Sequence, residues 1–364
     1  MMFSTTQAYG RGGVQAYSRR VAEILSEYAD RRGGELHGVS LQDDGWSSEQ
    51  HPNPVRYASF SAARGSRAEF IRMSASTAWR ARPRLAVVMH TCIAPPALLF
   101  RKARMTGPYI LVLHGIEAWH RMKPAVRAAA AGASRIVATT RFTANEFARA
   151  NDIPEDRFSV IPLAVGDSRT AATTPPQMDG ELRVLTVGRL SADDAYKGFD
   201  MLISAASQAR AGGANIQLRI IGDGDDRERL QSHAASRGLD ELSVHFLGAV
   251  PDNELRRELR DCHVFALPSR AEGFGIVYLE AMCLGRPCIA GNHGGPPEII
   301  DDGVDGFLVE HGDIGQLASR LVRFYQEPSL SGEMGRKAAE RVQREYLFNH
   351  MRDGWFKLLD EAAE

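Results

Sequence analysis

The chain has 364 residues, of which 44% are hydrophobic and 24% charged, and its formal net charge is −1. This length favours two domains that each bury a core, and no apolar run is long enough for a membrane-spanning helix. The first ten residues lack the basic start and apolar core of a secretion signal, so we expect a cytoplasmic protein whose four cysteines are reduced and buried.

The charge is divided unevenly along the chain. Residues 1–165 hold 22 Lys and Arg against 13 Asp and Glu, whereas the remainder holds 22 against 32. A basic front half favours an anionic partner, such as a phospholipid surface, a lipid-diphosphate or an acidic glycan, unless it is merely a solvated face. We expect no nucleic-acid partner, because the acidic half would repel a long polyanion and no binding motif is present.

The first half of the chain alternates short aliphatic runs with amphipathic stretches. After a first strand of only a few residues come Gly12 and Gly13, and then a helix with a buried stripe at helical spacing: Val14, Tyr17, Val21, Leu25 and Tyr28. Further strands are predicted at 35–40, 85–90, 109–114 and 135–139. The alternation is typical of a doubly wound parallel sheet.

The glycine cluster Gly10-Arg11-Gly12-Gly13 stands between the first strand and its helix. Backbone amides without neighbouring side chains, together with the positive end of a helix dipole, suit a phosphate group. A plain structural turn is the alternative, since the spacing is not that of a dinucleotide-binding loop.

An arginine-rich segment follows at 56–84, with aromatic residues between its seven arginines. A helix over 64–80 would bring Phe70, Ile71 and Trp79 near one another, with Arg64 and Arg67 at their flank. This layout is compatible with docking on an anionic membrane. The alternative is that the aromatic side chains belong to the core and the arginines are solvated.

A polar, proline-containing run at 166–180 interrupts the alternation. We therefore predict a first domain at 1–168, a linker at 169–181 and a second βα domain at 182–345. The strands of the second domain are expected at 182–187, 216–221, 244–247, 264–267 and 287–290. Residues 332–364 look helical, and the end of the chain, 346–364, is expected to pack back on the first domain. Two such domains would place a ligand in a cleft at the carboxyl ends of both sheets.

Two cations stand where the second domain begins. Arg189 ends the first strand in Gly188-Arg189-Leu190, and Lys197 precedes a helix in Lys197-Gly198-Phe199. Two such cations at the edge of a sheet can hold a diphosphate and neutralise its charge as it leaves. Taken alone, either could be a surface charge.

The sequence 272–280 places two carboxylates across a loop-to-helix junction. Glu272 lies in a glycine loop, and Glu280 lies in the following helix among apolar neighbours, where a carboxylate without a partner is costly. The amides of the first helical turn, at Phe274, Gly275, Ile276 and Val277, are free donors. The alternative is that Glu280 faces solvent.

The run from Ser269 through Glu280 to Pro287, with Gly294-Gly295 and Glu298 beyond, resembles the retaining glycosyltransferases of family 4, which have the GT-B fold of two Rossmann-like domains facing each other across a cleft. Gly188-Arg189-Leu190, Lys197-Gly198 and Gly222-Asp223-Gly224 match further segments of that family in the correct order. The resemblance implies a metal-independent hexosyltransferase that uses a nucleotide sugar, of GDP-mannose or UDP-glucose type, in polysaccharide or glycolipid synthesis.

The resemblance also assigns roles to residues. Arg189 and Lys197 would hold the donor diphosphate, which Gly12 and Gly13 would face from the other domain. Glu280 would bind the ribose hydroxyls. Other residues implied on the donor side are Gly222, Glu272, Gly273, Phe274, Gly275, Ile276 and Val277. His114 matches the histidine near the donor sugar, although a lone histidine at a strand end is more often structural, and Arg141 is a weaker candidate for the acceptor side.

The sequence Gly222-Asp223-Gly224-Asp225 contains the Asp-x-Asp pattern of metal-dependent transferases and part of a dinucleotide-binding loop. We expect neither a metal nor a cofactor, because Arg189 and Lys197 supply the charge that a metal would supply. A nucleotide-sugar epimerase, a glycosyl phosphorylase and a non-enzymatic two-lobed sugar-binding protein remain as rivals.

Overall fold

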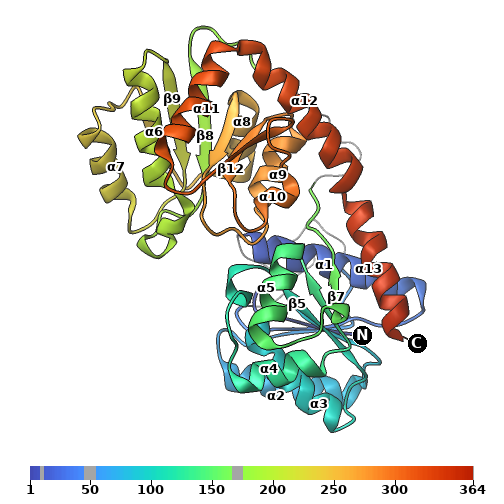
Figure 1. Ribbon diagram of the computed structural model, residues 1–364. Coiled ribbons are helices and arrows are strands. Elements are labelled where there is room, and N and C mark those ends of the chain that lie inside the picture. Colours follow the sequence, from blue (N-terminus) through green and yellow to red (C-terminus); the bar gives the residue numbers. More distant parts are fainter. Residues whose placement is uncertain (9–11, 45–54, 166–174, 364) are drawn as a thin grey trace. The chain divides into compact units, whose positions relative to one another are not determined.

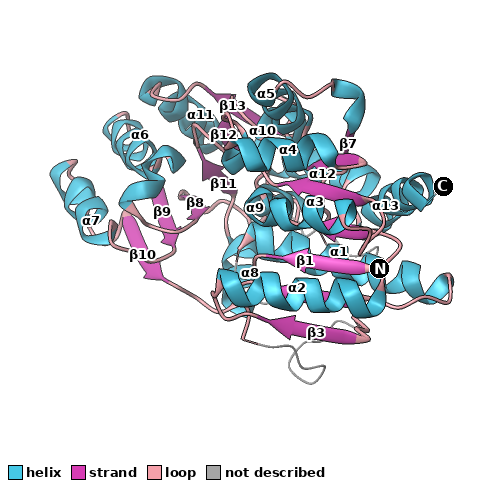
Figure 2. Ribbon diagram, turned by 90° about the horizontal axis from the view of Figure 1, so that it is seen from below, coloured by secondary structure: helices cyan, strands magenta, loops and turns pink. Residues whose placement is uncertain are grey.

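The chain forms two compact units in the computed structural model, which describes residues 1–8, 12–44, 55–165 and 175–363. Unit 1 comprises Met1–Leu163 and Asn349–Glu364, and unit 2 comprises Ala164–Phe348. Residues 169–174 of the predicted linker at 169–181 lie outside the described residues, as do Gly10 and Arg11. In each unit, helices flank a sheet whose strands pair in parallel (Figures 1 and 2). The predicted fold class of two Rossmann-like domains is confirmed.

Unit 1 has seven strands in the order β3-β2-β1-β4-β5-β6-β7. The strands are β1 (Met2–Thr5), β2 (His37–Ser40), β3 (Ser59–Ala62), β4 (Ala86–Val88), β5 (Tyr109–Leu113), β6 (Arg135–Ala138) and β7 (Phe158–Val160). The helices are α1 (Gly13–Arg31), α2 (Arg67–Ala81), α3 (Ala94–Lys102), α4 (Pro124–Gly132), α5 (Arg141–Asn151) and, at the end of the chain, α13 (Phe348–Ala363).

Burial explains why these segments were recognisable. All five residues of β5 are buried, as expected for a parallel strand that is covered on both faces. The predicted stripe of α1 is confirmed at Tyr17, Val21, Leu25 and Tyr28, which are buried, whereas Val14 is only partly buried. Tyr28 also contacts α13, because its hydroxyl donates to Asp360 at 2.7 Å and its ring packs edge-on against Phe356.

Unit 2 has six strands in the order β10-β9-β8-β11-β12-β13. The strands are β8 (Leu182–Val187), β9 (Ile216–Ile221), β10 (Val244–Gly248), β11 (Val264–Leu267), β12 (Cys288–Gly291) and β13 (Gly306–Val309). The helices are α6 (Phe199–Ala211), α7 (Arg227–Ser236), α8 (Asp252–Asp261), α9 (Ile276–Cys283), α10 (Pro296–Ile299), α11 (Ile314–Gln326) and α12 (Pro328–Glu345). None of the described helices combines the length and the apolar character that crossing a membrane would need.

Several local predictions were wrong or incomplete. Strands β3, β7 and β13 were not predicted; β3 reads Ser-Phe-Ser-Ala at the edge of its sheet, where partial exposure leaves little apolar pattern. The chain beyond residue 332 is not continuously helical, since α12 ends at Glu345 and α13 begins at Phe348. Cys92 is exposed rather than buried.

We predict that Gly222→Ala destabilises unit 2 by about 2–4 kcal/mol. Gly222 follows β9 with a φ of 139°, and a Cβ there would lie 1.8 Å from the Gly188 carbonyl oxygen at the end of β8. Gly238→Ala is the matched control, because Gly238 has a φ of 75° but open space around it, and should cost about 1 kcal/mol. Denaturant unfolding measures both variants, and equal losses would contradict the close approach.

Candidate functional site

The candidate site of unit 2 lies where the strand order reverses. From β8 the chain first builds β9 and β10 on one side, and then crosses to build β11, β12 and β13 on the other. In parallel sheets, ligands bind outside the carboxyl ends of the strands at such a reversal. Arg189 and Lys197 follow β8, and the loop from Glu272 to Gly275 follows β11. The topology therefore brings the predicted residues to one edge of the sheet.

Arg189 and Lys197 converge on a buried carboxylate, that of Asp194. The Arg189 Nε and Nη2 donate to the two Asp194 oxygens at 2.8 and 3.0 Å, and the Lys197 Nζ lies 3.6 Å from Oδ2. Burial alone would raise the pKa of Asp194, but the hydrogen bond from Arg189 and the charge of Lys197 outweigh it, so this pKa lies below its ordinary value. The site thus holds two cations around one ionised acid.

The loops after β8 and β11 are joined through their backbones. The amide of Arg270 donates to the Tyr196 carbonyl at 2.7 Å, and the Ser269 hydroxyl donates to the same oxygen at 3.3 Å. Gly198, with a φ of 80°, has no side chain, and this lets the Pro268 carbonyl approach. A Cβ at this position would lie 2.5 Å from that oxygen. These contacts bring Lys197 close to Glu272.

Glu272 lies at the centre of this edge. Burial raises the pKa of its carboxyl group, while the charge of Lys197 and hydrogen bonds from the amides of Gly273 and Phe274 lower it by less. Gly275, with a φ of 91°, caps α9, so the amides of Ile276 and Val277 open the first helical turn, where no earlier carbonyl of the helix can pair with them. An acid, two cations and a helix start therefore share one surface.

Glu280 lies elsewhere on α9, facing α8. Burial raises its pKa to about 7, and the charge of Arg256 on α8 offsets this only in part. Within the described residues, no hydrogen bond or ion pair joins Glu280 to Arg189 or Lys197. The structure therefore unites Arg189, Lys197 and Glu272, and leaves Glu280 as a second, partly buried acid nearer α8.

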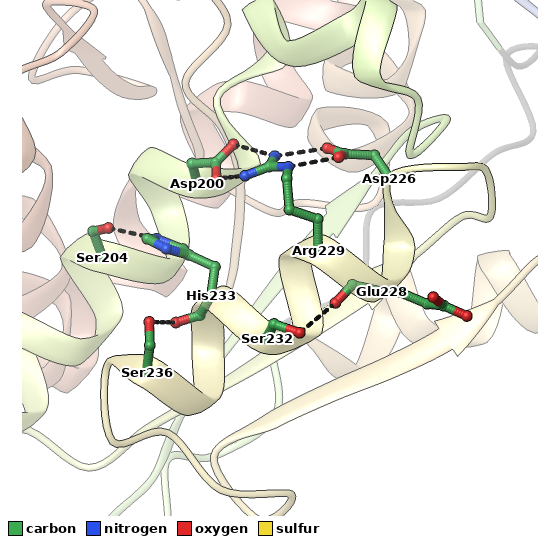
Figure 3. Close-up of polar contacts among 8 residues, drawn as sticks. All are labelled: Asp200, Ser204, Asp226, Glu228, Arg229, Ser232, His233 and Ser236. Atoms are coloured by element: carbon green, nitrogen blue, oxygen red, sulfur yellow. Dashed lines mark hydrogen bonds and ion pairs between the residues drawn. The ribbon is translucent and has the colours of Figure 1, made fainter.

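The loop from Gly222 to Asp226 packs on the end of β8 and is held by ion pairs with Arg229. Arg229 of α7 makes paired bonds to Asp226 and to Asp200, which stands in the first turn of α6 (Figure 3). The acids of the Asp-x-Asp pattern are engaged as well: Asp223 lies 3.6 Å from Arg227, and Asp225 accepts from the Ala192 amide at 3.2 Å. Gly222 therefore acts in loop packing, and this loop supports the site around Arg189.

Unit 1 also has a reversal of strand order, between β1 and β4, and predicted site residues follow the strands near it. Gly12, with a φ of 132°, precedes α1 after β1, and His90 follows β4. His114 follows β5, and Arg141 opens α5 after β6. Gly13 is the first residue of α1. All lie beyond the carboxyl ends of neighbouring strands.

His114 is buried and held in one orientation. Its Nε2 bonds the Met89 carbonyl oxygen, and its amide donates to Glu117 at 2.7 Å. Burial lowers the pKa of His114, and also that of His90, whose ring centroid lies 6.0 Å away. A neutral imidazole that donates through Nε2 keeps Nδ1 as an acceptor.

The arginine-rich segment is only partly as predicted. Helix α2 begins at Arg67 rather than at Arg64, which stands in the preceding turn, and Phe70 is buried in the core rather than displayed beside Ile71. Trp79 is 64% exposed and lies about 18 Å along the axis from Arg67. Phe70 therefore belongs to the core, as the alternative expected, whereas Ile71 and Trp79 are exposed and docking on a membrane stays a prediction.

Two further residues were missed by sequence reasoning, Asp194 and His90. Asp194 stands one helical turn before Lys197, a spacing at which opposite charges meet, and this could have indicated the pair. His90 lies just beyond β4, as His114 lies just beyond β5. The bidentate pairing of Asp194 with Arg189 depends on the loop conformation, which no spacing rule contains.

Two family models match the chain. Glycosyltransferase Family 4 matches residues 12–169, and Glycosyl transferases group 1 matches residues 172–341. A GDP-mannose-dependent alpha-(1-6)-phosphatidylinositol monomannoside mannosyltransferase of Mycolicibacterium smegmatis is 29% identical over 89% of this chain and 88% of that relative. The protein of the same description from Mycobacterium tuberculosis is 28% identical over 93% and 92%.

Solved structures share the fold. Anabaena HepE, in complex with UDP and glucose, superposes with a TM-score of 0.78 at 21% identity, covering 99% of both chains. A glycosyltransferase of Rickettsia africae superposes with a TM-score of 0.81 at 16% identity, covering 100% of this chain and 98% of the other. These neighbours show a GT-B architecture.

We predict that Glu280→Gln raises the melting temperature of unit 2 above about pH 6. A carboxyl group whose pKa is raised on folding retains its proton while the unfolded chain has lost it, so stability falls as pH rises from the ordinary glutamate value to about 7. Glutamine removes this loss, which is on the order of 2 kcal/mol or roughly 4 to 8 °C at pH 8. Scanning calorimetry at pH 5 and pH 8 measures the difference.

Glu333→Gln, on the exposed face of α12, is the control and should behave like wild type at both values of pH. A Glu280→Gln variant no more stable than wild type at pH 8 would show that the carboxylate is already satisfied.

Proposed function

The chain belongs to glycosyltransferase family 4, and on that premise we propose that it moves a hexose from a nucleotide sugar to a glycan or lipid-linked acceptor in polysaccharide or glycolipid synthesis. The observation that carries the proposal is the convergence of Arg189, Lys197 and Glu272 at the strand reversal of unit 2. A cationic pair beside a helix start suits a diphosphate, and an adjacent acid suits sugar hydroxyls.

We propose the following roles in unit 2. Arg189 and Lys197 neutralise the diphosphate as the bond between the sugar C1 and the phosphate oxygen breaks. Glu272, with the amides of Phe274 and Gly275, positions the transferred sugar, and Glu280 accepts hydrogen bonds from the ribose. The roles of Gly12, Gly13, His114 and Arg141 in unit 1 stay predictions from the family resemblance.

The proposal also includes transfer that retains the anomeric configuration of the sugar and needs no metal ion. The acceptor oxygen would bond to C1 from the face that the diphosphate leaves, and a phosphate oxygen would take the acceptor's proton. Lys197 and Arg189 supply the charge neutralisation that a divalent cation provides elsewhere. The contacts of Asp223 with Arg227 and of Asp225 with the Ala192 amide support this assignment, since each acid of the Asp-x-Asp pattern already has a partner within the protein.

The choice of donor rests on the relatives. The mycobacterial proteins are described as GDP-mannose-dependent, so GDP-mannose is the donor to test first and UDP-glucose the second. The acceptor named for those relatives, phosphatidylinositol monomannoside, serves as the first trial acceptor.

We predict that Arg189→Ala and Lys197→Ala each lower nucleotide release from the active donor by about 10²- to 10³-fold, because each removes a group that neutralises the leaving diphosphate. Arg189→Ala takes the bidentate partner from the buried Asp194 carboxylate, so its melting temperature should fall, and turnover is measured at a temperature where the variant stays folded. Lys337→Ala, at an exposed position of α12, is the control and should keep wild-type turnover. Near-normal turnover in both site variants would refute the assignment.

We also propose that unit 1 contacts an anionic membrane through the α2–α3 surface, which is defined by exposed apolar side chains among basic ones. Ile71 and Trp79 of α2 are 47% and 64% exposed, and Leu99 of the adjoining α3 is 64% exposed. Arg82 stacks on the Trp79 ring at 5.3 Å. The neighbouring basic residues are Arg67, Arg72, Arg80, Arg101, Lys102 and Arg104. Apolar and basic side chains together favour an acidic lipid surface.

We predict that Trp79→Ala weakens flotation with vesicles that contain acidic phospholipid by about tenfold, because the indole would no longer enter the headgroup region. Leu242→Ala removes an equally exposed apolar side chain from unit 2 and should float like wild type. Equal recovery of the wild-type protein with neutral and acidic vesicles would rule out electrostatic docking.

A further inference from the structure

A buried acid stands between the two cations of unit 2, and the roles proposed above leave it unexplained. The Asp194 side chain is 6% exposed, whereas the Arg189 and Lys197 side chains are 68% and 18% exposed. The carboxylate therefore lies on the inner side of both cations, and the guanidinium reaches solvent on its other side.

The geometry leaves donors available on the outer side. Asp194 uses one N–H at Nε and one at Nη2 of Arg189. A guanidinium carries five N–H donors, so three remain for an incoming ligand. A planar group held by two parallel bonds also has its orientation fixed, which a single contact does not achieve.

The backbone that carries Asp194 is held from several sides. Its amide donates to the Ser191 carbonyl at 2.8 Å, and its φ of −100° breaks the short helical turn from Ala192 to Lys197. The Ala192 amide donates to Asp225, and the Tyr196 carbonyl accepts from the loop after β11. The carboxylate is thus fixed by its surroundings, and the cations orient on it.

We infer that Asp194 is a positioning residue, which holds the Arg189 guanidinium and the Lys197 ammonium in the arrangement that receives the donor diphosphate. The inference rests on the proposed function. Asp194 offsets the repulsion between two neighbouring cations and leaves these three groups with a net charge of +1, which attracts a diphosphate, while its own carboxylate lies behind the cations. An exposed arginine without this partner would sample many rotamers and meet the phosphate less often.

Binding of GDP and UDP to the full chain, measured by titration calorimetry, tests the inference. Asp194→Asn keeps the size of the side chain and removes its charge, and we expect it to weaken binding of the nucleotide that wild type prefers by about 10- to 100-fold. Asp193→Asn changes the exposed acid next in sequence and should alter the affinity by less than about twofold. Melting temperatures of all variants are measured in parallel.

A double-mutant cycle separates positioning from a purely structural role. Asp194→Asn should have a smaller effect in an Arg189→Ala background, because the group it positions is gone. Equal effects in both backgrounds, or a lower melting temperature with unchanged affinity of the folded protein, would overturn the inference. Tighter nucleotide binding by Asp194→Asn would also overturn it, since Asp194 would then compete with phosphate. A wild-type protein that binds neither nucleotide would overturn the proposed function together with the inference.

Discussion

Parallel pairing of β8 with β11 is the constraint on which the candidate site of unit 2 depends. The register sets Val184 beside Val264, so both strands send their following loops past the same edge of the sheet. Those loops then approach so closely that a side chain is excluded: a Cβ at Gly198 would lie 2.5 Å from the Pro268 carbonyl oxygen. The position of Glu272 relative to Lys197 is therefore set by backbone packing, and the polar contacts refine it.

Two arginines of unit 2, Arg286 and Arg189, differ in the groups to which they donate hydrogen bonds. Arg286 is almost completely buried and donates to the carbonyls of Leu259 and Arg260 at the end of α8, so it caps that helix. Arg189 instead bonds a side chain and faces solvent with its remaining donors. Arg286 therefore bonds backbone within the fold, whereas Arg189 keeps donors on a solvent-exposed side, where the proposed function places the ligand.

The sequence predicted the sheets well and the site in part, and the differences have physical causes. Strands such as β5 are continuous apolar runs because they are buried on both faces, whereas the edge strand β3 carries no such pattern. Glycine spacing and strand order were enough to place Arg189, Lys197 and Glu272 at one edge. The spacing could have indicated the pairing of Asp194 with Lys197, but its contact with Arg189 was not predictable, because that contact requires a break in a helical turn that depends on tertiary hydrogen bonds.

Before a ligand binds, the charged groups around the site differ in whether their charge is balanced by a partner. Arg189 and Lys197 already have an ionised partner in Asp194, whose pKa is low, whereas Glu272 and Glu280 have raised pKa values because burial is only partly offset. Hydroxyl groups of a sugar or ribose donate hydrogen bonds to an ionised carboxylate, so their arrival would lower these pKa values and stabilise the charged form. If the proposed roles hold, the positive charges are in place for phosphate before the donor arrives, and its sugars would relieve the cost that burial imposes on the two acids.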